Sequence, residues 1–182
     1  CSDGVFGKVY GTAPLWHFRQ STPRTQAGRG VRKLAKTLQK APDILDGLHA
    51  LSSAIIDAAP YSMTETEAHT TAEEALSAGG GVCQDHAQIF VSAARVAGIP
   101  ARYISGYLMM NDRVDQDASH AWAEAHLDGL GWVGFDVSNR ICPDERYVRI
   151  ATGLDSHDAS PMSGIRLGSA RESMIVSLQV QQ

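Results

Sequence analysis

Cys83 lies in the segment 79–87, GGGVCQDHA, where three glycines precede a pattern typical of a helix. From Cys83 to Ala97, small and apolar residues recur every three or four positions, as one face of a helix requires. Gly98 and Pro100 then end the pattern. We therefore expect Cys83 in the first helical turn, where unpaired backbone N–H groups and the helix dipole favour a negative charge. A cysteine there can act as a thiolate, which is the nucleophile of many acyl-transfer enzymes.

A nucleophilic thiolate works with a base and with an acid that orients the base. Residues 118–127, ASHAWAEAHL, alternate between small or apolar residues and larger ones, and His120 belongs to the second set. After DGLG, residues 132–138, WVGFDVS, alternate in the same way and carry Asp136 opposite the apolar positions. These two segments predict a β-hairpin of two half-buried strands.

The length of the hairpin turn decides whether His120 and Asp136 can meet. If both apolar faces contact the same core, the turn must have an odd number of residues. A three-residue turn pairs Trp122 with Asp136 and His120 with Ser138, which makes His120 and Asp136 diagonal neighbours on one face. Two side chains can bridge the diagonal Cβ separation of roughly 7 Å. We therefore predict a three- or five-residue turn or a bulge, because a four-residue turn would put the two residues on opposite faces.

The order Cys, His, Asp and the motifs GVCQDHA, GIPARYISGYL and SHAWAEAHLDGLGWVGFDVSN resemble the core of the transglutaminase-like superfamily, in particular its bacterial cysteine-peptidase branch. The resemblance covers residues 45–150. It implies an α+β fold, a papain-like core in which the nucleophile helix packs on an antiparallel β-sheet. It also implies that Cys83 is the nucleophile, His120 the general base and acid, and Asp136 the residue that orients the imidazole. Arylamine acetyltransferases and peptide N-glycanases resemble this core too, so the resemblance leaves the substrate open.

Other helices should support the nucleophile helix. The spacing predicts an amphipathic helix over residues 29–40, whose basic stripe we interpret as a solvated face. A second helix should begin after Asp43 and cover the nucleophile helix. A short third helix should run from a capping box at Thr71 and Glu74 to Gly79. The glycines 79–81 should bring the backbone close to a substrate carbonyl, and we expect the Cys83 amide N–H to bind the oxyanion.

Strand patterns complete the expected sheet. Residues 101–110, ARYISGYLMM, should form the neighbour of the His120 strand, with a polar loop over residues 111–119. A short strand is expected at residues 146–150, and a closing strand near residues 174–180 should pair at a sheet edge.

Several candidate residues also have purely structural explanations. A cysteine in an apolar helix can be a small buried hydrophobe. Asp85 either supports the site or only stabilises the helix N-terminus. Three further histidines are expected to be structural or exposed, and two tryptophans either line the substrate site or pack: His69, His86 and His126, and Trp122 and Trp132.

The whole chain of 182 residues has the composition of one globular domain. We assign residues 1–28 to an N-terminal arm, which could be the remnant of a preceding β-rich domain, and residues 29–182 to the catalytic domain. A net charge of −4 gives no indication of a nucleic-acid or membrane partner. Three cysteines, an odd number, argue against a disulfide framework. A cytoplasmic, reducing location fits a free nucleophilic thiol best, and a periplasmic location is the alternative. Since the chain begins with Cys1, we expect a fragment or a processed product.

The expected function is thiol-dependent acyl transfer by Cys83, His120 and Asp136, with hydrolysis of a peptide or amide bond through a thioester as the first hypothesis. The partner would then be a peptide or protein substrate, and neither a metal nor another cofactor is expected. One alternative is a protein-glutamine transglutaminase with an amine acceptor. Another is a non-catalytic transglutaminase-like module that binds proteins. The oligomeric state stays open.

Overall fold

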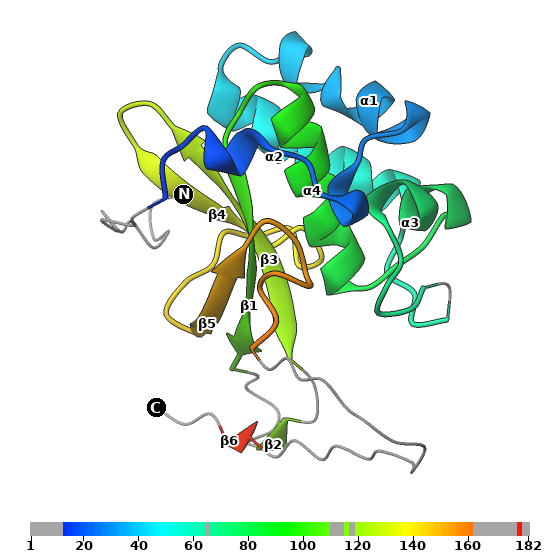
Figure 1. Ribbon diagram of the computed structural model, residues 1–182, viewed down its shortest axis with the longest axis vertical. Helices are drawn as coiled ribbons and strands as arrows, with labels where there is room; N and C mark the ends of the chain where they lie inside the picture. Colours follow the sequence, from blue (N-terminus) through cyan, green and yellow to red (C-terminus); the bar gives the residue numbers. More distant parts are fainter. Residues whose placement is uncertain (1–12, 65, 110–114, 117–118, 162–177, 180–182) are drawn as a thin grey trace.

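The computed structural model describes residues 13–64, 66–109, 115–116, 119–161 and 178–179. Four α-helices cover one face of a four-stranded antiparallel sheet, which confirms the expected α+β class (Figure 1). The helices are α1 (Arg29–Ala35), α2 (Ile44–Ala58), α3 (Ala72–Ala78) and α4 (Cys83–Val96). The strands of the sheet, in spatial order, are β4 (Gly131–Phe135), β3 (His120–Leu127), β1 (Ala101–Leu108) and β5 (Tyr147–Gly153).

Helix α4 lies between the other helices and the sheet, as Figure 1 shows. It begins at Cys83 and ends at Val96 before Gly98, whose φ of 82° is the left-handed conformation that glycine adopts readily. Nearly the whole of its surface is buried, and Ile89 and Phe90 have no exposed area. The strands β3 and β4 supply the facing apolar residues of the same core. Helix α4 is therefore the central element of the fold, as the sequence predicts.

The caps that the sequence predicts for the other helices are present. The Asp43 side chain accepts a hydrogen bond from the Asp46 amide at 2.8 Å and begins α2, which packs on α4. Thr71 and Glu74 form the predicted capping box of α3, and Gly79 ends that helix with a φ of 76°. These caps hold α2 and α3 in place around the start of α4.

The predicted helix over residues 29–40 is shorter than expected. Helix α1 ends at Ala35, and a 3-10 turn covers Leu38–Lys40. The hydroxyl and the amide of Thr37 both donate to the Leu34 carbonyl, at 2.8 and 2.9 Å, so the local bonds of a threonine replace the next helical turn.

The face of the sheet that points away from the helices is also largely buried, so the prediction of half-buried strands is wrong. Phe18 of the N-terminal segment packs edge-on against Trp132, with ring centroids 5.0 Å apart. The Arg102 guanidinium lies over the same Trp132 ring, 4.0 Å from its centroid. Glu124 is 3% exposed because Arg102 and Arg149 both pair with its carboxylate. A buried acid is tolerated here because two guanidinium groups neutralise it.

Arg95 connects the N-terminal segment to the rest of the fold. Its buried guanidinium donates to the carbonyls of Phe18, Ala101 and Leu154 and to the Thr25 hydroxyl, at distances between 2.8 and 3.1 Å. Burial lowers the pKa of Arg95 to about 10, although the charges of two nearby aspartates act in the opposite direction.

The closing strand expected near residues 174–180 falls mainly outside the described residues. Its described part, β6 (Leu178–Gln179), pairs with β2 (Asp115–Gln116) in a separate two-stranded sheet. The polar loop expected over residues 111–119 lies mostly outside the described residues as well.

Candidate active site

The start of α4 is held by a short backbone bridge. Tyr61 and Gly81 form an isolated parallel bridge, in which the Ser62 amide donates to the Gly81 carbonyl at 2.9 Å. A side chain at Gly81 would meet the Asp85 Cβ at 2.8 Å, so only glycine fits between the bridge and the helix. The residue that follows this tight segment by two positions is Cys83, the first of the helix.

Asp85 completes this helix start. Its carboxylate is fully buried and accepts hydrogen bonds from the Val82 amide at 2.9 Å and the Thr66 hydroxyl at 2.6 Å. The residue therefore caps the N-terminus of α4. Of the two explanations that the sequence leaves open, these contacts support the structural one.

The Cys83 side chain is half-buried and has a free thiol. It packs against Ala87, Tyr103, Ala121 and Ala159. Within the described part of the chain, the Cys83 amide N–H makes no backbone hydrogen bond, as expected for the first residue of a helix. The expectation that this amide binds an oxyanion stays a prediction.

The hairpin brings His120 and Asp136 together as predicted. Leu127 pairs with Gly131, so the turn has three residues, and the same register continued places Asp136 opposite Trp122. His120 Nε2 lies 2.6 Å from Asp136 Oδ2. The diagonal contact that the odd turn length requires is thus present.

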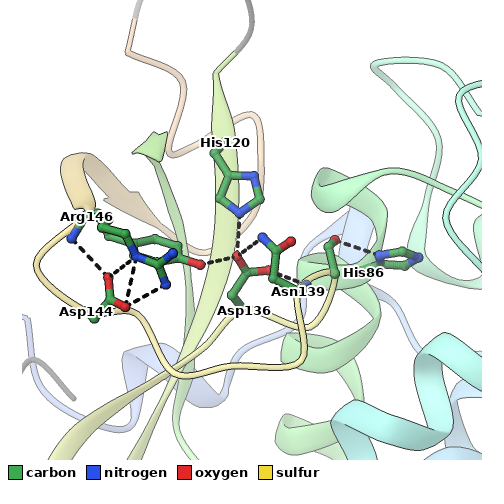
Figure 2. Close-up of polar contacts among 8 residues, drawn as sticks. His86, His120, Asp136, Asn139, Asp144 and Arg146 are labelled. Carbon is green, nitrogen blue, oxygen red and sulfur yellow. Dashed lines mark hydrogen bonds and ion pairs between the residues drawn. The ribbon is translucent and has the colours of Figure 1, made fainter. Parts of the chain in front are cut away.

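Asp136 has no exposed surface and accepts hydrogen bonds at both carboxylate oxygens (Figure 2). Three groups donate to it besides His120. The backbone N–H of Asn139 donates to Oδ1 at 3.1 Å, and the side-chain Nδ2 of Asn139 donates to Oδ2 at 2.7 Å. The Tyr147 hydroxyl also donates to Oδ2, at 2.7 Å. Burial by itself raises the pKa of Asp136, but these donors and the charge of His120 outweigh burial and lower it. The carboxylate therefore stays ionised.

His120 carries a proton at neutral pH in this arrangement. Burial lowers its pKa, but hydrogen bonds to Asp136 and Cys83, together with the charges of both, raise the pKa to about 10. Since Nε2 binds Asp136, Nδ1 is the ring nitrogen left for Cys83. The order Cys83, His120, Asp136 matches the arrangement of a nucleophile, a proton carrier and an orienting acid.

The three other histidines lie outside this arrangement. His86 is buried, and its ring nitrogens bind the Ser138 hydroxyl and the Ala59 carbonyl, both at 2.8 Å. His69 is exposed beside Glu67. His126 contacts the ring of Trp132, with centroids 5.3 Å apart. These positions agree with the prediction of structural or exposed roles.

The two tryptophans pack rather than line an open surface. Trp122 is 2% exposed and Trp132 is 8% exposed. Trp122 stacks near His120, with centroids 6.4 Å apart, so it supports the imidazole from the side.

Asn139 and Tyr147 contact Asp136, although the sequence analysis does not identify them as site residues. The Asp136–Asn139 spacing resembles the local turns that aspartate side chains form with nearby backbone amides, and this signal could have identified Asn139. No sequence pattern identifies Tyr147, because its position depends on how β5 pairs with β1.

The odd number of cysteines argues against a disulfide framework, yet Cys142 is disulfide-bonded. The cytoplasmic location that was inferred in part from cysteine usage stays a prediction. Among the described residues, no helix combines the length and the apolar character needed to cross a bilayer.

A cysteine at the start of a helix, facing a histidine and an aspartate on an antiparallel sheet, defines a papain-like α+β class of protein. Residues 32–137 match the model of the transglutaminase-like superfamily, and the chain belongs to this family. An uncharacterized protein of Mycobacterium tuberculosis is 34% identical over 154 residues, which are 79% of this chain and 49% of that protein. An uncharacterized protein of Mycobacterium leprae is 30% identical over 173 residues, 88% of this chain and 59% of the relative. The chain thus spans about half the length of these relatives.

Solved structures share this fold. A "putative cysteine protease" from Cytophaga hutchinsonii superposes with a TM-score of 0.74 at 26% identity, over 92% of this chain and 56% of the other. The periplasmic domain of TgpA from Pseudomonas aeruginosa superposes with a TM-score of 0.53 at 22% identity, over 70% and 49% of the two chains. The second similarity concerns the fold alone.

Proposed function

We propose that this protein is a thiol-dependent acyl-transfer enzyme that hydrolyses a peptide or amide bond through a thioester. The observation that carries the proposal is the placement of Cys83 at the start of α4, where it interacts with His120, whose Nε2 lies 2.6 Å from the buried Asp136. A protonated His120 beside Cys83 stabilises a thiolate, because an opposite charge at short range favours the charged form. The similarity to the Cytophaga hutchinsonii protein supports hydrolysis as the outcome.

The first half of the proposed reaction breaks the amide bond. The Cys83 thiolate attacks the carbonyl carbon, and the negative charge that develops on the oxygen is bound by the Cys83 amide N–H. His120 then gives its proton to the departing nitrogen, so that the amine leaves and a thioester remains on Cys83.

The second half restores the enzyme. Neutral His120 takes a proton from water, and the resulting hydroxide equivalent attacks the thioester carbonyl. The acid product leaves, the sulfur regains its negative charge and His120 is again protonated. Asp136 holds the ring through Nε2 in both halves and stabilises its charged form.

An amine could resolve the same thioester in place of water, which would make the protein a transglutaminase. A casein labelled with fluorescein and the fluorescent amine dansylcadaverine distinguish the two outcomes in one assay. We expect release of labelled peptides without incorporation of the amine, and loss of the release in Cys83→Ala. Incorporation of the amine in the absence of peptide release would favour the transferase.

Labelling of Cys83 by iodoacetamide tests the proposal without a known substrate. At pH 6 an ordinary thiol with a pKa of about 8.5 is less than about 1% thiolate. We expect Cys83 to react at pH 6 far faster than this fraction allows, and to lose the excess rate in His120→Ala. His126→Ala, a substitution of a histidine outside the site, is the matched control. An ordinary rate in the unmodified protein would support the binding-module alternative instead.

A further inference from the structure

Three side chains donate to the same oxygen of Asp136. Oδ2 accepts hydrogen bonds from His120 Nε2 at 2.6 Å, Asn139 Nδ2 at 2.7 Å and the Tyr147 hydroxyl at 2.7 Å (Figure 2). His120 and Asn139 belong to the hairpin and the turn that follows it. Tyr147 comes from β5, at the opposite edge of the sheet from β4. Its contact with Asp136 therefore joins two parts of the sheet that are not neighbours.

A β-bulge sets the direction of Tyr147. Strands β1 and β5 pair regularly as far as Ser105 and Ala151, after which the register skips Ile150 and pairs Leu108 with Tyr147. Because successive side chains alternate between faces, one skipped residue moves the rest of the strand to the opposite face. Without the bulge, Tyr147 would fall on the face that α4 covers.

The face that Tyr147 reaches is the one that carries His120. Gly106 pairs with His120 across β1 and β3, and Leu108 lies on the same face two residues later. A Cβ at Gly106 would lie 2.8 Å from the Trp122 ring, so its absence lets Trp122 lie across β1. The Trp122 ring then packs edge-on against Tyr147, with centroids 5.4 Å apart, while the His120 and Tyr147 centroids are 6.0 Å apart.

The titratable and charged groups that face Asp136 and His120 come from α4 and β5. Helix α4 contributes Cys83 and His86, whereas β5 contributes Tyr147, whose neighbour Arg146 is paired with Asp144. No solvent reaches Asp136, so its proton affinity depends on its donors. A hydroxyl that donates to this carboxylate stabilises its charged form and weakens the negative potential at His120.

We propose that Tyr147 is a positioning residue of the site, whose hydroxyl orients the Asp136 carboxylate and limits how tightly it holds the proton on His120. This inference rests on the proposed function, in which that proton must leave for the departing amine and return in the next step. An imidazolium held too strongly would be a poor acid. Because the Tyr147 hydroxyl donates a hydrogen bond to the Asp136 carboxylate, it weakens the negative potential at His120. The proton on His120 can then still be transferred.

Tyr147→Phe removes the hydroxyl and keeps the ring that packs against Trp122. The test is an NMR titration of the His120 ring in protein labelled with 13C-histidine, with the signal assigned by its absence in His120→Gln. We expect the titration midpoint to rise by about half a pH unit, because part of the free energy of the lost hydrogen bond to the charged carboxylate passes to the proton on His120. Tyr107→Phe, a half-buried tyrosine of β1, should leave the midpoint unchanged.

An unchanged or lower midpoint in Tyr147→Phe would overturn the inference. A lower melting temperature with an unchanged midpoint would do the same, since it would show that Tyr147 only packs. The titration needs no substrate and does not depend on turnover. If the midpoint rises while Cys83 proves unreactive, the proposed function fails and the role of Tyr147 in positioning Asp136 stands.

Discussion

The contact between His120 Nε2 and Asp136 Oδ2, at 2.6 Å, joins the first residue of β3 to the residue that follows β4. Asp136 is fully buried, and the His120 side chain is 15% exposed. Because the aspartate has no access to water, the charge on the imidazole is its main source of compensation. The two residues should therefore respond to pH as a pair.

The contribution of His120 to stability should disappear at high pH. Its pKa is raised from 6.5 to about 10 in the folded protein, so the contribution is fully present below pH 6.5 and is lost as the pH rises through 10. The free energy of unfolding, measured in urea between pH 6 and pH 10.5, should differ most between the protein and His120→Gln at pH 6 and converge above pH 10. A difference that stays constant would show that packing of the ring supplies the stability.

The opposite behaviour is expected at low pH for Asp136. Its pKa is lowered from 3.8, so its contribution is present above pH 3.8 and is lost as the pH falls below that value. The difference in unfolding free energy between the protein and Asp136→Asn should shrink below pH 3.8. Asp57→Asn, a change at an exposed residue, provides the baseline.

Asp136→Asn should reduce the labelling of Cys83 less than His120→Ala does. The asparagine side chain lacks the negative charge that stabilises the imidazolium. Its carbonyl oxygen can still accept a hydrogen bond from His120 Nε2. We expect the labelling rate at pH 6 to fall by on the order of ten-fold, the effect of a one-unit change in proton affinity. Equal losses in the two variants would mean that Asp136 does more than orient and stabilise the ring.

Gly81→Ala should disturb the nucleophile, whereas Gly79→Ala should not. The new Cβ at position 81 would meet the Asp85 side chain at 2.8 Å, and overpacking of this kind costs about 1–3 kcal/mol. At Gly79 there is open space, and only the φ of 76° is strained by alanine, at about 1 kcal/mol. Both variants should melt at lower temperature, but only Gly81→Ala should lower the rate of Cys83 labelling. A normal rate in Gly81→Ala would show that this segment does not position Cys83.

Loss of Glu124 should destabilise the protein strongly. Glu124→Ala leaves the Arg102 guanidinium buried and without the carboxylate that lies 2.6 Å from its Nη2. Breaking a buried ion pair in this way costs about 3–5 kcal/mol. Asp57→Ala, which breaks the exposed pair with Arg140, should cost less than about 1 kcal/mol in the same urea titration. Similar small losses in both would mean that solvent reaches Arg102 once Glu124 is gone.

The periodicity of the sequence is sufficient to predict the elements that hold the site. Local features depend on residues that are close in sequence, so the sequence pattern predicts them directly. These features are the helix that begins at Cys83, the glycine after its end and the capping box at Thr71. The contact between His120 and Asp136 is also predictable, because the parity of the hairpin turn fixes which residues share a face.

Contacts that depend on distant pairing could not be predicted. The burial of Glu124 requires Arg102 from β1 and Arg149 from β5, and alternation in β3 alone indicates an exposed position. Tyr147 reaches Asp136 only because the register skips Ile150, and no property of isoleucine in the sequence marks a bulge. The roles of Cys83, His120 and Asp136 in catalysis remain predictions that the labelling and turnover experiments test.

The bonds of Arg95 have a consequence for cooperativity. Its guanidinium is held at once by the N-terminal segment, by the start of β1 and by the loop after β5. If residues 13–28 detached alone, the buried Arg95 guanidinium would lose its hydrogen bonds to that segment. The free-energy cost of leaving these donors unpaired would be comparable to that of unfolding the core. We therefore expect this segment to exchange its amide hydrogens at the same slow rate as α4, and the protein to unfold in one transition.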